Sequence, residues 1–278
     1  MRFATIRTAA GTRAARIEGD VLVELVERDV GALLQAGPDA MARATGATGT
    51  EHPIAKADFA PVVTHPGKVI CQGLNYRNHI VEMGHDLPRY PTLFAKFREA
   101  LIGAHDDIVL PALSDRVDWE VELALVVGRP VRHANRDVAA QAIAGFTVAN
   151  DISMRDWQGR SREWLQGKSW ERSTPVGPWL VTPDEVGGPT PDLEVTCAVD
   201  GVERQRSRTS ELVFDPVDLV AYASEFVTLE PGDLLLTGTP AGVGAAMTPP
   251  VFLRPGQVVQ TRVVGVGELR NRCRPEVP

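Results

Sequence analysis

The sequence has few cysteines and lacks long apolar runs. Cys71, Cys197 and Cys273 lie far apart, so they do not form the spacing of a zinc finger. A small, odd number of cysteines without a secretion signal over Met1–Glu18 is typical of reduced thiols. No stretch approaches the roughly eighteen unbroken apolar residues that a membrane helix needs. We therefore expect a cytoplasmic protein that does not insert into membranes.

Acidic residues outnumber basic ones, and lysine is rare. The formal net charge of -7 argues against nucleic acids or anionic membranes as partners, because both require a basic surface. A small anionic substrate stays possible, since a few basic side chains can form a local pocket. The chain contains only the lysines Lys56, Lys68, Lys96 and Lys168.

The length and composition favour a globular, β-rich fold. A chain of 278 residues with 44% hydrophobic residues can bury a substantial core. The 25 glycines and 21 prolines indicate many turns. The run His65-Pro66-Gly67 marks a plausible boundary, which predicts a small N-terminal α/β domain over residues 1–65 and a catalytic domain over 66–278. We expect an α+β fold in which loops carry the chemistry.

Alternating and apolar runs bounded by turn residues predict the main elements. A helix is expected from a cap at Asp29 through Ala36, and another over Pro216–Phe226. The expected strands are Arg2–Thr8, Arg13–Glu18, Val21–Leu25, Val69–Cys71, Trp119–Val127, Ala144–Val148, Leu193–Val199, Leu234–Thr237 and Val258–Val264.

One predicted strand carries closely spaced acidic residues. In the run Val117–Leu123 apolar and acidic residues alternate, so Glu120 and Glu122 would lie on one face, about 6.6 Å apart along the strand. A third acid, Asp151, follows the apolar run 143–150. Carboxylates suit magnesium, manganese or calcium, whereas zinc prefers Cys and His ligands. From spacing alone, a solvated acidic strand face is an equally good interpretation.

A histidine and a glutamate share one face of a short predicted helix. His79 and Glu82 are three residues apart, and Gly84 would end the helix. A carboxylate beside an imidazole orients it and raises its basicity, as a water-activating base requires. From spacing alone, an ordinary surface pair is the alternative.

Seven segments, in this order, resemble the fumarylacetoacetate hydrolase family, from Lys68 to about Asn271. They are GLNYRNHIVEMG, PTLFAKF, VDWEVELALVVG, AGFTVANDISMRDWQ, LQGKSW, TPVGPWLVT and GDLLLTGTPAGVG. The resemblance implies a mixed β-sheet roll and a homodimer.

The resemblance also implies a site. By matching positions, a divalent metal (magnesium or manganese, with calcium possible) would be held by Glu120, Glu122 and Asp151. His79 and Glu82 would form the catalytic dyad on a lid segment.

The substrate-holding residues follow from the same matches. Arg155, Gln158 and Thr239 would bind the substrate, and Lys168 would act in catalysis. The longer hydrolases of the family have an aspartate ligand at the position of Gln72, so we expect water to complete the coordination. This departure is typical of the shorter, acylpyruvase-like branch.

The implied activity is metal-dependent hydrolysis of a C–C bond in acylpyruvate-like 2-oxo acids. The same metal and enolate chemistry also serves oxaloacetate decarboxylation, and isomerisation or dehydration of 2-oxo acids. The His79–Glu82 pair favours hydrolysis, because the other reactions depend less on an activated water. A metal-binding scaffold without activity is the remaining alternative.

Overall fold

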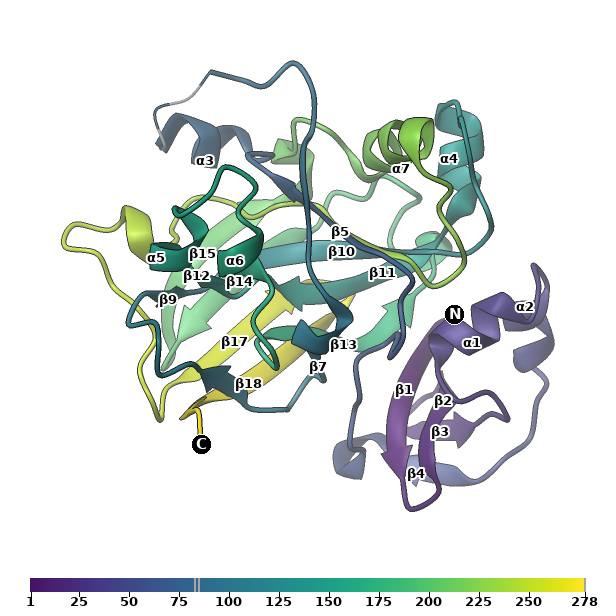
Figure 1. Ribbon diagram of the computed structural model, residues 1–278. Coiled ribbons are helices and arrows are strands. Elements are labelled where there is room, and N and C mark those ends of the chain that lie inside the picture. Colours follow the sequence, from purple (N-terminus) through teal and green to yellow (C-terminus); the bar gives the residue numbers. More distant parts are fainter. Residues whose placement is uncertain (83, 85, 278) are drawn as a thin grey trace.

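The chain folds mainly into two β-sheets with short helices around them (Figure 1). The computed structural model describes residues 1–82, 84 and 86–277, and the side chain of His79 lies outside that description. Strands outnumber helices among these described residues, which confirms the expected β-rich α+β class.

The larger sheet joins the N-terminal strands to the central ones. Its β1 (Arg2–Thr8) pairs antiparallel with β13 (Thr174–Val181), and β7 (Leu101–Ile102) also pairs with β13. The N-terminal strands therefore continue the central sheet, while the boundary at residue 66 stays a prediction. The order of the other strands is β4 (Glu51–Pro53), β3 (Val21–Glu24), β2 (Gly11–Glu18), β1 (Arg2–Thr8), β13 (Thr174–Val181), β11 (Ile143–Asn150), β10 (Val121–Val127), β16 (Leu234–Leu236), β5 (Val69–Gly73) and β6 (Thr92–Ala95).

The second sheet has five strands, and a short two-stranded ladder lies beside the site. The ladder pairs β9 (Val117–Asp118) with β12 (Ser153–Met154). The order of the five-stranded sheet is β15 (Val202–Arg208), β14 (Glu194–Val199), β17 (Val258–Val263), β18 (Gly267–Pro275) and β8 (Ile108–Leu110).

The main hydrophobic core lies between the two sheets. It combines Leu125 and Phe146 of the larger sheet with Cys197, Val259 and Leu269 of the smaller one. A second cluster covers the opposite face of the larger sheet, where the first helix packs. Both faces of the central strands are therefore buried, which explains why they are almost continuously apolar.

The helices are short, and several begin at side-chain caps. The carboxylate of Asp29 accepts from the amide of Ala32, as expected, and Asp215 forms a capping box with Asp218. None of the helices in the described ranges is long and apolar enough to cross a membrane. The helices are α1 (Val30–Gln35), α2 (Ala40–Ala44), α3 (Arg77–Glu82), α4 (Arg136–Ala142), α5 (Arg155–Gln158), α6 (Leu165–Lys168) and α7 (Pro216–Phe226).

The acidic strand differs from its expected form. β9 ends at Asp118 and β10 starts at Val121, so Trp119 and Glu120 lie outside the ladder. The backbone amide of Trp119 donates to Asp118, and its indole donates to the carbonyl of Gly242. One local and one tertiary contact thus accompany the break in the strand, and sequence alternation does not reveal them.

Replacing Phe146 tests the central core. The side chain is fully buried between the sheets, so Phe146→Ala should lower the free energy of unfolding by about 3–5 kcal/mol in urea denaturation. Val138→Ala, on a side chain that is 46% exposed, is the control and should have a much smaller effect. Equal effects of the two changes would contradict the placement of the core.

Candidate active site

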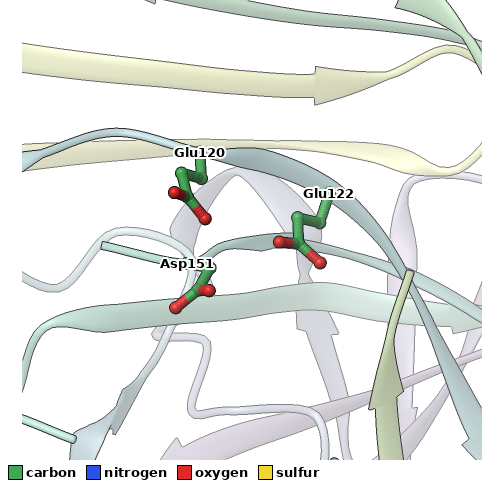
Figure 2. Close-up of side chains that lie close together, drawn as sticks. All are labelled: Glu120, Glu122 and Asp151. Atoms are coloured by element: carbon green, nitrogen blue, oxygen red, sulfur yellow. The ribbon is translucent and has the colours of Figure 1, made fainter. Parts of the chain in front are cut away.

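Three carboxylates meet where β10 begins and β11 ends. Because Val121 pairs with Asn150, Glu120 lies beside Asp151, whose amide donates to the Glu120 carbonyl at 2.9 Å. One carboxylate oxygen from each of Glu120, Glu122 and Asp151 lies within 4.8 Å of the others. Figure 2 shows the three side chains turned toward a shared region. We call these residues the carboxylate trio.

The trio is buried. The exposed fractions of Glu120, Glu122 and Asp151 are 5%, 1% and 0%. They are therefore not a solvated acidic strand face. Burying ionised carboxylates is costly unless opposite charges or a metal compensate them.

Two buried lysines supply part of the compensation. Lys168 Nζ donates to Glu120 Oε2 at 2.8 Å and to Asp151 Oδ2 at 2.7 Å. Lys96 Nζ donates to Asp151 Oδ1 at 2.5 Å. Burial by itself would raise the pKa of Asp151, but the two ammonium groups more than offset this and lower that pKa to about 2. Asp151 is therefore a carboxylate at neutral pH.

Arg155 and Asp118 connect the trio to the loop after β16. Arg155 Nε donates to Asp118 Oδ2 at 2.8 Å, and a terminal guanidinium nitrogen lies 2.7 Å from Glu120 Oε1. The Asp118 carboxylate also accepts from the amides of Gly244 and Ala245, at 2.7 and 2.9 Å. Asp118 therefore fixes that loop against the trio.

Glu122 has no ammonium or guanidinium partner in the described part of the chain. Its Oε2 accepts from the amide of Gly238 at 2.7 Å. Burial, together with the charges of Asp151 and Glu120, raises the pKa of Glu122 well above its usual range. Burial in the metal-free protein therefore favours the protonated form of Glu122 more than water would.

The charges and donor atoms fit a divalent cation. Four acids (Asp118 and the trio) face three basic side chains, Lys96, Arg155 and Lys168, and the uncompensated position is Glu122. Carboxylate oxygens are the ligands that magnesium, manganese and calcium prefer. The trio could therefore hold such an ion, whose charge would compensate Glu122.

A cavity of about 290 Å³ opens beside Glu120. It brings together four of the six side chains that the resemblance assigns to substrate binding and catalysis, namely Arg155, Gln158, Lys168 and Thr239. Thr239 Oγ1 accepts from Gln205 Nε2 at 2.8 Å, which leaves its own hydroxyl hydrogen available to a ligand. The assigned roles of these residues stay predictions.

Close packing of α5 on α6 positions two of these side chains. A Cβ atom on Gly167 would lie 2.4 Å from the backbone nitrogen of Gln158, so this approach requires glycine. The contact places Gln158 and Lys168 on the same cavity, where Gln158 Oε1 also accepts from Arg155 at 2.9 Å.

The predicted dyad lies on α3, near one edge of the cavity. Glu82 Oε2 accepts from the amide of Gly242 at 3.4 Å, and the next residue, Val243, lines the cavity. The side chain of His79 is outside the described part of the structure, so its role stays a prediction.

The structure adds residues that the sequence interpretation did not assign. Lys96 stands in the PTLFAKF segment and is one of only four lysines, which was an available signal. Asp118 belongs to the same alternating run as Glu120 and Glu122, but the spacing did not distinguish its role. Phe94, of the same PTLFAKF segment, and Trp164, directly before LQGKSW, also line the cavity.

The fold and the trio define a class: a β-rich enzyme whose buried carboxylates suit a divalent metal. The family model for the fumarylacetoacetate (FAA) hydrolase C-terminal region matches residues 68–274. The chain therefore belongs to the fumarylacetoacetate hydrolase family, which confirms the resemblance.

Relatives within this family carry out different reactions. The chain is 43% identical to the mitochondrial oxaloacetate tautomerase Fahd2a of Rattus norvegicus, over 86% of this chain and 77% of that protein. A 5-carboxymethyl-2-hydroxymuconate delta-isomerase from Mycobacterium smegmatis is 36% identical, with a TM-score of 0.82 and full coverage of both chains. A fumarylacetoacetate hydrolase from Exiguobacterium antarcticum is 29% identical, with a TM-score of 0.86, over 99% of this chain and all of that one.

Replacing a trio residue should remove the metal site. Asp151→Asn takes away a charged oxygen ligand, so magnesium affinity in calorimetry should fall more than about 100-fold, beyond the usual effect of outer-shell changes. Asp115→Asn, on a side chain that is 82% exposed, should leave the affinity unchanged. Parent-level binding by the Asp151 variant would remove this residue from the site.

Metal affinity should rise with pH. The raised pKa of Glu122 means that the carboxyl is protonated below that pKa, and a metal must then displace the proton. Because one proton is released for each metal ion bound, the affinity should rise by up to about tenfold per pH unit at pH values below the pKa of Glu122. Magnesium titration in buffers of different ionisation enthalpy measures this proton release. Magnesium binding without proton release at pH values below that pKa would contradict the raised pKa of Glu122.

Proposed function

We propose that the protein is a divalent-metal-dependent enzyme that interconverts the keto and enol forms of a short 2-oxo acid, with oxaloacetate as its substrate. The observation that carries the proposal is the carboxylate trio with Lys168 bridging two of its members at the cavity. This arrangement offers fixed positive charge where an enolate develops. The 43% identity to an oxaloacetate tautomerase supports the choice of reaction.

The chain's own residues explain how the substrate could be held and activated. A divalent ion on Glu120, Glu122 and Asp151 would supply Lewis-acid stabilisation of the enolate. Lys168 places its ammonium next to the carboxylate oxygens of Glu120 and Asp151. Burial by itself would lower the pKa of Lys168, but the charges of Asp151 and Glu120 raise that pKa overall, so Lys168 stays charged. Arg155 and Gln158 orient the substrate carboxylate.

Tautomerisation requires one proton to leave carbon and one to reach oxygen. The C3–H bond breaks, its electron pair forms the C2–C3 double bond, and the oxo oxygen takes up a proton. We assign the transfer at C3 to the α3 pair, His79 and Glu82, because Glu82 contacts the loop that lines the cavity. Thr239, with its hydroxyl hydrogen available, is placed to donate to the developing oxygen.

Hydrolysis of acylpyruvates is the second candidate. It uses the same enolate, but it also needs an activated water, for which His79 and Glu82 would be the base. The similarity to a fumarylacetoacetate hydrolase supports this candidate, and the position of Glu82 beside Gly242 suits both reactions. Pyruvate release distinguishes it from tautomerisation.

Magnesium as the metal, a homodimer and a cytoplasmic location belong to the same proposal. The trio favours hard cations in general rather than magnesium in particular. The Rattus norvegicus relative is named as mitochondrial, so fractionation of the native cells is the direct test of location.

The experiment follows enol absorbance and pyruvate release in parallel. Oxaloacetate and acetylpyruvate are supplied with magnesium, with manganese or with chelator. Metal-dependent loss of the oxaloacetate enol without pyruvate formation is the expected result. Pyruvate from acetylpyruvate would establish the hydrolase instead, and inactivity with both acids would refute both candidates.

Replacing Glu82 tests the assigned proton transfer. Glu82→Gln should lower the catalysed rate by about 100-fold, as for loss of a general acid–base group, while magnesium binding stays at the parent value. Glu225→Gln, on an exposed part of α7, is the matched control. An unchanged rate in the Glu82 variant would assign the proton transfer elsewhere.

A further inference from the structure

Trp164 has a strained backbone beside the site. Its φ of 61° and ψ of -11° place it in the left-handed region, directly before α6. A bulky residue in this conformation costs conformational free energy, so it persists where surrounding contacts fix it. Such strain is often found at ligand sites.

Two neighbours fix the indole ring. A Cβ atom on Gly73 would lie 2.4 Å from Cζ3 of Trp164, so the ring fills space that only glycine at position 73 leaves open. Phe94 meets the ring edge to face, with centroids 5.6 Å apart and an interplanar angle of 67°. We call Gly73, Phe94 and Trp164 the aromatic wall.

The aromatic wall and the charged groups line the same cavity. Glu120, Arg155 and Lys168 supply the charged part of the lining, and all three wall residues belong to it as well. Lys168 Nζ lies 4.9 Å from the centroid of the Phe94 ring, so the wall starts immediately beside the charged end. The volume of about 290 Å³ is at the lower limit of the roughly 300–1,000 Å³ common for ligand sites.

We propose that Trp164 sets the length of the substrate. A 2-oxo acid whose carboxylate and oxo oxygens sit on the charged side directs its distal end at the fixed indole. The site therefore takes acids of the size of oxaloacetate and excludes longer homologues. This inference rests on the proposed function for the identity of the reaction, but the length limit itself rests on the cavity.

The test compares 2-oxo dicarboxylic acids of increasing length. Deuterium incorporation at C3, followed by proton NMR with magnesium-loaded enzyme, reports enolisation of oxaloacetate, 2-oxoglutarate and 2-oxoadipate alike. The parent rate above the uncatalysed background should fall along this series. Trp164→Ala should raise the rate on 2-oxoadipate by about tenfold or more, and the ratio of this rate to the oxaloacetate rate should rise with it.

A second tryptophan provides the matched control. Trp157 packs against Trp170, with ring centroids 5.0 Å apart, and it is not part of the cavity lining. Trp157→Ala should therefore leave the length profile unchanged. If Trp164→Ala does not fold, Trp164→Leu is the smaller truncation with the same expected direction.

The outcomes separate the length limit from the proposed reaction. Equal loss on all three acids, or no gain on 2-oxoadipate, overturns the role of Trp164. If the parent enzyme catalyses no deuterium exchange at C3 of any of the acids, the proposed reaction is refuted. Calorimetric binding of the same acids then tests the length limit by itself. Binding of 2-oxoadipate about tenfold tighter by Trp164→Ala then supports it, and unchanged binding overturns it.

Discussion

The interaction on which the site depends is the bridge of the Lys168 ammonium between Glu120 and Asp151. Three carboxylates with almost no exposure would repel one another strongly in a medium of low dielectric constant. Lys168, Lys96 and Arg155 offset most of this repulsion through contacts of 2.5–2.8 Å. Glu122 receives no such ion pair from the described residues, and the negative charge that is left uncompensated there makes the trio suitable for a divalent ion.

The fold brings these charges together from segments that are distant in sequence. Asn150 connects the two sheets at this point: its side chain accepts from the amide of Glu120 at 2.9 Å and donates to Thr261 at 2.8 Å. Asp118 similarly fixes the loop after β16 through Gly244 and Ala245. Strand ends and loops thus supply the residues of the site, while the buried core between the sheets fixes the positions of these segments.

Local patterns predicted the elements well where local interactions decide them. The helix Pro216–Phe226 and the cap at Asp29 follow from capping chemistry, and both are present. The family resemblance selected the trio, because acidic spacing by itself left a solvated face open. Three features escaped prediction because they depend on contacts between distant segments: the role of Lys96, the break in the strand before Val121, and the aromatic wall.

The position of the aromatic wall has an evolutionary consequence. Gly73, Phe94 and Trp164 come from three separate segments, and none of them is a member of the carboxylate trio. Mutations in the wall can therefore change which acids fit, while the charged centre that stabilises an enolate stays intact. Selection can diversify substrate range in such a protein without first losing its chemistry, which suits a family whose members share one fold and act in different reactions.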